Sequence, residues 1–196
     1  MWLSWLRSLV VSLGVFSLFA SPSLTLADAS GLAADIENAR ASLQMEGSSA
    51  PYIQKVGAQR IAAWRAAAEK GSAEAQWLLS RCYALGVGVQ EDSAVAATWM
   101  RQSANQGFAL AQNNLGNIYE NGIGVEKDLA AARAFSARAA NQGEPAAQFH
   151  LARMDAAGVG VPADVQEAIE WSVKPAEKNN RAAFHALGEI FEFGRG

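Results

Sequence analysis

Residues 107–143 read GFALAQNNLGNIYENGIGVEKDLAAARAFSARAANQG, and the pattern of this stretch recurs before and after it. One position of the pattern returns every 36 residues as Gly71, Gly107, Gly143 and Asn179. Further positions return with the same period, namely Ala75, Ala111, Ala147 and Ala183; Leu79, Leu115, Leu151 and Leu187; and Gly86, Gly122, Gly158 and Gly194. Self-similarity at one fixed period identifies a repeat architecture, so the chain contains a tandem array of 36-residue units.

Each unit predicts a pair of helices. Ala75, Leu79 and Tyr83 are spaced i, i+4, i+8 and form one apolar stripe on a first helix. The Gly-x-Gly pair that follows suits a helix end in the left-handed conformation. An aspartate then opens the second helix as its N-cap, at Asp92, Asp128 and Asp164. Because one helical pair cannot bury both of its faces, we predict an all-α fold without a β-sheet. Its form is a right-handed α-solenoid of stacked helix pairs, with about 36 residues per repeat.

The clearest unit carries a family pattern. Its residues are Gly107-Phe108-Ala109-Leu110-Ala111-Gln112, Leu115-Gly116, Tyr119, Gly122-Ile123-Gly124-Val125, Asp128 and Ala139-Ala140-Asn141-Gln142-Gly143. This pattern resembles the Sel1-like repeat family, a relative of the tetratricopeptide repeats, and the resemblance covers residues 60–196. It implies scaffolds and adaptors that hold proteins or peptides, some of them periplasmic regulators of sensor kinases or helpers of envelope and polysaccharide assembly. Other secreted members pair many cysteines across helices, and this chain, with Cys82 alone, departs from them.

Three segments follow one another along the chain. Residues 1–27 are predicted to be a signal peptide, since Arg7 precedes an uncharged apolar run that ends at small residues. Residues 28–59 are predicted to form helices that cap the array and break near residues 47–51. The array occupies residues 60–196, with three full repeats and a partial fourth. We expect a periplasmic or secreted protein without stable membrane insertion after cleavage; the alternative is an uncleaved N-terminal helix that anchors the chain.

Composition and motifs exclude several classes of function. The formal net charge of -3 gives no basic footprint for nucleic acid. Cys82 cannot form an internal disulfide or a Cys-based zinc site. The equivalent positions of successive repeats, here called a column, are apolar in the case of Cys82, which indicates packing in the core. His150 and His185 lie in non-equivalent columns, without a carboxylate at a useful spacing, and are interpreted as structural. We therefore predict no catalytic residue, no metal site and no cofactor, and a protein that is not an enzyme.

The variable positions of the first helices form the candidate binding site. In tetratricopeptide repeats this helix lines the concave groove, and the resemblance implies the same arrangement here. The positions that vary combine aromatic, amide and charged side chains: Trp77, Arg81, Asn113, Asn117, Glu120, Phe149, Arg153, His185 and Glu189. Such a mixture suits an extended peptide or protein segment. The alternative is a solvated face that holds no ligand.

These features favour an exported, periplasmic adaptor or scaffold that binds another protein or peptide in its groove and regulates an envelope or signalling complex. The alternatives are a structural component of an envelope or polysaccharide-export assembly and, less favoured, a secreted hydrolase such as a β-lactamase-like enzyme. Asp155 replaces an aromatic residue of its column, so the third repeat is expected to lose core volume there. The fourth repeat stops after its first helix. Its apolar face is expected to be capped by self-association or by a partner, unless the chain is a fragment of a longer repeat protein.

Overall fold

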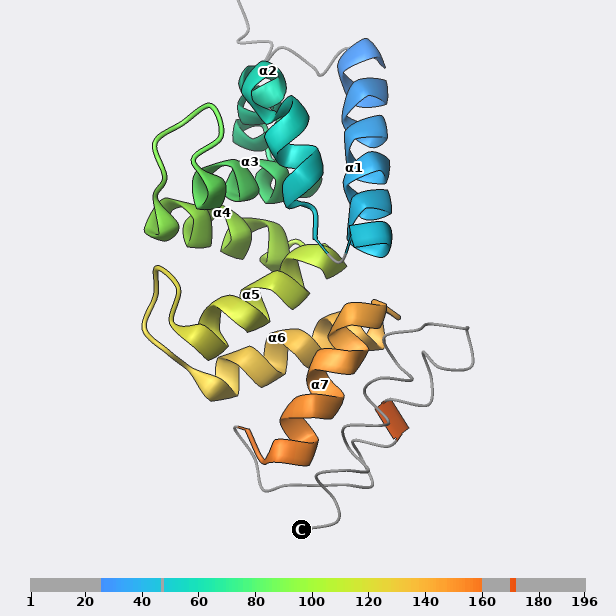
Figure 1. The fold of residues 1–196 in the computed structure, drawn as a ribbon, viewed down its shortest axis with the longest axis vertical. Helices are drawn as coiled ribbons and strands as arrows, with labels where there is room; N and C mark the ends of the chain where they lie inside the picture. The colour runs from blue at the N-terminus through green and yellow to red at the C-terminus, as the bar shows by residue number, and fades with distance from the viewer. Residues whose placement is uncertain (1–25, 47, 160–169, 172–196) are drawn as a thin grey trace, which may run out of the picture.

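A computed structural model describes residues 26–46, 48–159 and 170–171 of the 196-residue chain. In this part of the chain the regular structure is entirely helical, as predicted. The helices with assigned bounds are α1 (Leu26–Glu46), α2 (Ala50–Glu69), α3 (Ala73–Leu85), α4 (Ser93–Asn105), α5 (Ala109–Asn121), α6 (Leu129–Asn141) and α7 (Pro145–Ala157). Figure 1 shows α2 to α7 stacked in chain order, while α1 runs beside the stack along the long axis of the molecule.

The helix ends explain why the helices of the array have a constant length. Each of α3 to α7 has 13 residues. The predicted caps Asp92 and Asp128 accept hydrogen bonds from free N–H groups in the first turns of α4 and α6, whereas Asp164 lies outside the described residues. The first helices end at glycines in the left-handed conformation, with φ of 66° at Gly86, 69° at Gly122 and 65° at Gly158. The same local chemistry therefore starts and stops each unit.

The repeated apolar columns form the core between neighbouring helices. The leucine column is buried: the exposed fraction is at most 1% at each of Leu79, Leu115 and Leu151. The alanine column is fully buried at Ala75, Ala111 and Ala147. Where α5 meets α6, a Cβ atom at Gly116 would collide with the side chain of Ser136, so a small residue is required there. In the preceding repeat Ser80 takes the position of Gly116 and donates to the carbonyl oxygen of Ala96 at 2.7 Å.

A ladder of glutamine amides joins each repeat to the next, and our sequence analysis did not predict it. Gln76, Gln112 and Gln148 occupy one column, and each Nε2 donates to the carbonyl oxygen eight residues earlier at 3.1 to 3.2 Å. Gln106 donates to Oε1 of Gln76 at 2.7 Å. Gln142 makes the same 2.7 Å contact with Gln112. The column is 4 to 7% exposed, so these bonds satisfy buried amides and hold the repeats in a fixed register.

The third repeat replaces an aromatic contact with a buried ion pair. Asp155 stands in the column of Tyr83 and Tyr119 and is fully buried. Arg133 on α6 contacts its Oδ1 atom at 2.9 Å. In the second repeat the equivalent tyrosine hydroxyl instead accepts from Arg101 at 3.2 Å. The prediction of lost core volume at Asp155 is thus incomplete, because Asp155 also gains an ion pair with an arginine of the preceding helix, α6.

Two helices, α1 and α2, precede α3. The chain breaks between α1 and α2, inside the range predicted for the break. The predicted boundary between residues 59 and 60 lies inside α2, so the cap and the array share one continuous helix. Helix α1 begins at Leu26, and the signal-peptide residues before it lie outside the described chain, as does the partial fourth repeat. None of the described helices has the length and apolar character needed to cross a membrane.

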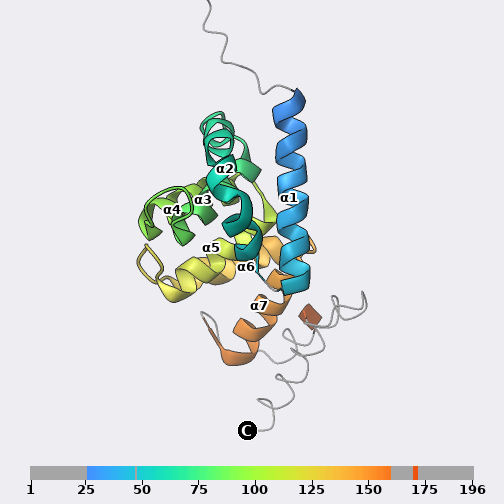
Figure 2. The same ribbon diagram turned by 45° about the horizontal axis from the view of Figure 1, so that its top comes forward.

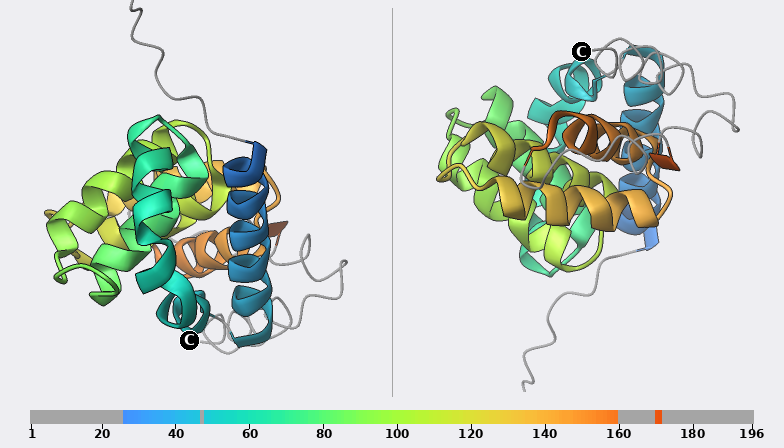
Figure 3. Two further views of the ribbon diagram at one scale, coloured as in Figure 1. Left: turned by 90° about the horizontal axis from the view of Figure 1, so that it is seen from above. Right: turned by 90° about the horizontal axis from the view of Figure 1, so that it is seen from below.

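One carboxylate fastens α1 to α2. Asp35 is 7% exposed and accepts hydrogen bonds from Tyr52 Oη at 2.7 Å, Arg60 Nη2 at 2.7 Å and Trp64 Nε1 at 2.8 Å. Burial, together with the hydrogen bond to Asp35, raises the pKa of Tyr52 to about 12, so the phenol remains a donor. We call these four residues the Asp35 cluster. They account for the position of α1 beside α2, which Figure 2 and Figure 3 show from three further directions.

Candidate protein-binding face

The first-repeat end of the predicted groove is covered by the chain itself. Trp77 is fully buried, in a core cluster that also contains Ile36 and Ala39 of α1 and Leu110 of α5. Its ring meets Phe108 edge to face, with 5.9 Å between the centroids. The prediction that Trp77 anchors a partner is therefore corrected: it is a core residue, because α1 packs over it.

Arg81 lies one turn further along α3. Its Nε atom donates to Ser49 Oγ at 3.2 Å, and Ser49, in the connection between α1 and α2, is 1% exposed. Among the described residues this hydroxyl is the only hydrogen-bond partner of the guanidinium, and no carboxylate forms an ion pair with it. Burial lowers the pKa of Arg81 from its usual value, although the group stays charged at physiological pH.

Three of the four asparagines of α5 are spaced four residues apart. Asn113 is 7% exposed, and its Oδ1 atom is buried without a hydrogen-bond partner among the described residues. Asn117 Nδ2 donates to the carbonyl oxygen of Asn113 at 3.3 Å, and Asn121 Nδ2 donates to that of Asn117 at 2.9 Å. An unpaired buried acceptor costs roughly 1–3 kcal/mol, so Asn113 has hydrogen-bonding capacity that the described contacts do not use.

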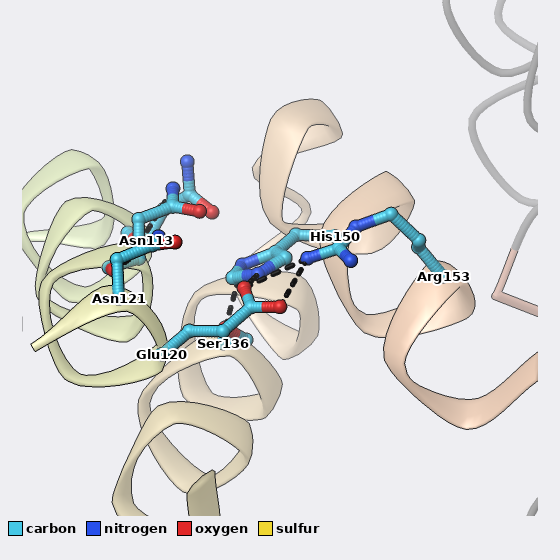
Figure 4. A network of polar contacts seen from close by, with 7 residues as sticks. Asn113, Glu120, Asn121, Ser136, His150 and Arg153 are labelled. Carbon is cyan, nitrogen blue, oxygen red and sulfur yellow. Dashed lines mark hydrogen bonds and ion pairs between the residues drawn. The ribbon is translucent and has the colours of Figure 1, made fainter. Parts of the chain in front are cut away.

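Glu120, in the last turn of α5, connects α5 to α7. Its two carboxylate oxygens accept from Arg153 Nη2 at 2.6 and 2.7 Å, and Oε2 also accepts from His150 Nε2 at 2.6 Å (Figure 4). The other ring nitrogen, His150 Nδ1, lies 3.0 Å from Ser136 Oγ on α6. An ionised carboxylate only accepts, which assigns the ring proton to Nε2 and makes the Ser136 hydroxyl a donor to Nδ1. We call these four residues the Glu120 cluster.

Burial and the arginine together decide the charges of the Glu120 cluster. Burial lowers the pKa of His150, and the hydrogen bond to Glu120 offsets this only in part, since Arg153 opposes a second positive charge. Burial on its own would raise the pKa of Glu120, but the hydrogen bonds from Arg153 and His150 outweigh it and hold that pKa below its usual value. At neutral pH the cluster combines an ionised glutamate, an ionised arginine and a neutral histidine.

Serine, histidine and glutamate also meet in hydrolases, but this geometry does not suit that chemistry. Ser136 is fully buried and His150 is 5% exposed, so a substrate reaches neither, and both ring nitrogens already have partners. Burial raises the pKa of Cys82 to about 12, which keeps this buried thiol unreactive. In the described ranges no group of three or more histidine, cysteine, aspartate or glutamate side chains could hold a metal ion.

Among the predicted groove residues, direct contacts join Asn113 with Asn117 and Glu120 with Arg153. Five members of the predicted groove lie on α5 and α7, and we call this surface the α5–α7 face: Asn113, Asn117, Glu120, Phe149 and Arg153. Phe149 is half-buried, whereas Arg153 leaves 43% of its side chain exposed. His185 and Glu189 lie outside the described residues.

The partner of His150 does not follow from the 36-residue period. His150 is buried, but the prediction that no carboxylate stands at a useful spacing from it is wrong, because Glu120 Oε2 lies 2.6 Å from its Nε2 atom. The signal was present at a separation of 30 residues rather than 36, which links Glu120 with His150 and Gln112 with Gln142. A search for complementary side chains 30 residues apart would have found both pairs.

Helix pairs of constant length, stacked in series through the same hydrogen bonds, define an α-solenoid. The Sel1 repeat family model matches residues 73–108, 109–144 and 145–180, more than half of the chain. The chain therefore belongs to the Sel1 repeat family, as its sequence pattern indicated. Members of this family generally serve as protein-interaction scaffolds. The family models that match this chain are Sel1 repeats, and no model of an enzyme domain is among them.

Two solved structures are similar to this chain. A Sel1 repeat protein from Oxalobacter formigenes is 33% identical, with a TM-score of 0.64, over 85% of this chain and 48% of its own. The protein c5321, a protective antigen present in uropathogenic Escherichia coli strains and displaying the SLR fold, is 28% identical. Its TM-score is 0.66, over 82% of this chain and 33% of its own. This chain thus spans about half and one third of their lengths. Among curated proteins, none matches it.

Proposed function

We propose that this protein is an exported, periplasmic adaptor that binds another protein, or an extended segment of one, on its α5–α7 face. The general role of the Sel1 repeat family supports the binding function. The apolar run and small residues at the N-terminus support export. By holding its partner, the adaptor regulates an envelope or signalling complex.

The observation that carries the proposal is the fixed presentation of Arg153. Its guanidinium is held by both oxygens of Glu120, yet 43% of the side chain is exposed. Asn117 on α5 and Phe149 on α7 are also partly exposed. Arginine and aromatic side chains dominate many protein interfaces, and a side chain that is already ordered loses less entropy on binding. The α5–α7 face therefore offers a preorganised surface for a partner.

Site-specific photo-crosslinking tests this surface. A photoreactive amino acid is introduced at Asn117 or at Phe149 and, as a matched control, at Thr98, which is exposed on the second helix α4. We expect the same protein to be crosslinked from both α5–α7 positions and not from α4. Equal labelling from all three positions, or none from any, contradicts the proposal. Capture of envelope- or polysaccharide-assembly proteins would assign the structural role instead of the regulatory one.

The mass of the mature protein tests export. Cleavage after Ala27 leaves Asp28 as the N-terminal residue, and we expect this species in the periplasmic fraction. A protein that keeps residues 1–27 and sediments with membranes contradicts export as a soluble adaptor.

A further inference from the structure

Three arginines of the described chain pair with carboxylates, whereas Arg81, like Arg101, donates its hydrogen bond to a hydroxyl. Arg60, Arg133 and Arg153 each lie against a carboxylate, at 2.7, 2.9 and 2.6 Å. In the described part of the chain Arg81 has only the Ser49 hydroxyl, which occupies its Nε atom. A guanidinium has five N–H donors, so its two terminal nitrogens keep their hydrogen-bonding capacity.

No nearby group of the described chain compensates the positive charge of Arg81. The one ionisable neighbour that affects it is Cys82, and the pKa of that thiol is about 12, so it is uncharged at physiological pH. Burial lowers the pKa of Arg81 because part of its hydration is lost in the fold. Folding therefore removes water from this cation at a cost in free energy. In a buried ion pair the attraction of the counter-charge would offset that cost, and here it does not.

The position of Arg81 connects this charge to the proposed binding surface. Arg81 takes in the first repeat the place that Asn117 and Arg153 take in the second and third. Arg81 is neither fully buried nor fully exposed, and its terminal nitrogens are not among the fully buried, unpartnered atoms of the described chain. A segment that follows the first helices from α7 towards α3 passes the partly exposed Asn117 on α5 and then reaches an uncompensated cation on α3.

We propose that Arg81 binds a carboxylate of the partner segment, either an aspartate or glutamate side chain or a C-terminal carboxylate. This inference rests on the proposed function and adds the chemistry of the partner, which is acidic where it faces α3. A planar guanidinium matches a carboxylate in a two-point contact, and such charge-assisted bonds are among the strongest hydrogen bonds in proteins. The partner supplies the counter-charge that Arg60, Arg133 and Arg153 receive within the chain.

Peptide arrays probed with the mature chain provide the test. Random decapeptides are displayed in three sets: with aspartate and glutamate, with asparagine and glutamine in their place, and with the latter composition plus a free C-terminal carboxylate. We expect binding to the first or third set and weak binding to the second, which also tells the two sources of carboxylate apart. Equal binding to all sets overturns this inference and leaves the proposed function standing. Binding to none of them overturns both.

Variants of Arg81 then assign the effect to this residue. For the strongest acidic peptide, we expect R81M to raise Kd at least about tenfold, as for loss of a charge-assisted hydrogen bond. R65M, which removes an exposed arginine of α2, serves as the matched control and should leave Kd unchanged. Replacing the peptide carboxylate by an amide should weaken binding to the wild-type chain but not to R81M. Undiminished binding by R81M overturns the inference.

A structural role for Arg81 predicts a different outcome. If the residue serves only to hold the α1–α2 connection, S49A should weaken peptide binding as much as R81M does, and R81M should melt at a lower temperature. We expect S49A to bind within about threefold of wild type and R81M to melt no lower, since loss of an uncompensated buried charge is often neutral or stabilising. If R81M fails to fold, R81K keeps the charge without the planar fork and should still bind acidic peptides, though more weakly.

Discussion

The Asp35 and Glu120 clusters both join helices through a carboxylate, but they use different donor side chains. Each places a nearly buried carboxylate between two helices, where it accepts from an arginine and from a ring N–H. At Asp35 the ring belongs to Trp64, and the third donor is a phenol whose pKa is about 12. At Glu120 the ring belongs to His150, whose pKa burial holds below its usual value. Of the two clusters the second alone contains an imidazole, the side chain whose unperturbed pKa lies in the physiological range.

The largest effect is expected when Asp35 is removed. D35A leaves Trp64 Nε1 and the phenol of Tyr52 without their acceptor and Arg60 without its counter-charge. Breaking a buried ionic contact from one side typically costs about 3–5 kcal/mol. Urea denaturation should show a loss of this size, while E37A, an exposed acidic neighbour on α1, should show almost none. A small loss in D35A would mean that apolar contacts alone hold α1 in place.

A smaller effect is expected at the second cluster. E120A removes the acceptor of His150, which is buried, and of Arg153, which is exposed enough to regain water. Leaving one buried donor unpaired costs about 1–3 kcal/mol, so the free energy of unfolding should fall by that amount. E126A, in the exposed connection before α6, is the control. A loss equal to that of D35A would contradict the proposed difference between the two clusters.

The pH dependence separates the clusters most clearly. The pKa of His150 in the folded chain lies below its value of 6.5 in the unfolded chain, so the unfolded state binds more protons as the pH falls below that value. The free energy of unfolding should therefore decrease between pH 7.5 and 5.5, with at most about 1.4 kcal/mol per pH unit from one such group. H150Q should reduce this slope and D35A should not, as measured by urea denaturation at several pH values. Identical slopes in wild type and H150Q would refute the assignment.

The smallest effect is expected at the arginines themselves. The side chains of Arg60 and Arg153 are 38% and 43% exposed, so water replaces much of what each carboxylate provides. R60Q and R153Q should each lower the free energy of unfolding by less than about 1 kcal/mol. Thermal melts should thus leave R153Q nearly unchanged while binding on the α5–α7 face is weakened. A large loss of stability in R153Q would show that its contact with Glu120 serves mainly to hold the fold.

The regular part of the fold could be predicted because its causes are local. Helix starts at Asp92 and Asp128 and helix ends at Gly86 and Gly122 depend on a few adjacent residues, and the repeat shows each of them several times. Burial of the leucine column likewise follows from periodicity within one helix. The structure accordingly agrees with the predicted all-α solenoid of 36-residue repeats.

The binding face could be predicted only in part, because it depends on contacts between helices that are not adjacent in the chain. Trp77 is covered by α1, whose sequence has no repeat period from which its course could be inferred. The carboxylate of Glu120 meets His150 because α7 docks on α5 with an offset shorter than one repeat. Arg133 likewise pairs with Asp155, although the equivalent positions in the neighbouring repeats, Ala97 and Ile169, are uncharged. Such pairings arise from the stacking geometry rather than from any one helix.

The glutamine ladder bears on how such a chain can change its length over generations. Each hydrogen bond of the ladder joins equivalent atoms in successive units, so one unit can be removed and every remaining glutamine amide still has a partner. If residues 109–144 were deleted, Gln148 would stand where Gln112 now stands, eight residues after Ala104, and would find the same carbonyl oxygen. Duplication of a unit would add one such hydrogen bond in the same way. Genes of this kind can grow or shrink in steps of 36 residues, in line with the greater length of the two similar solved chains.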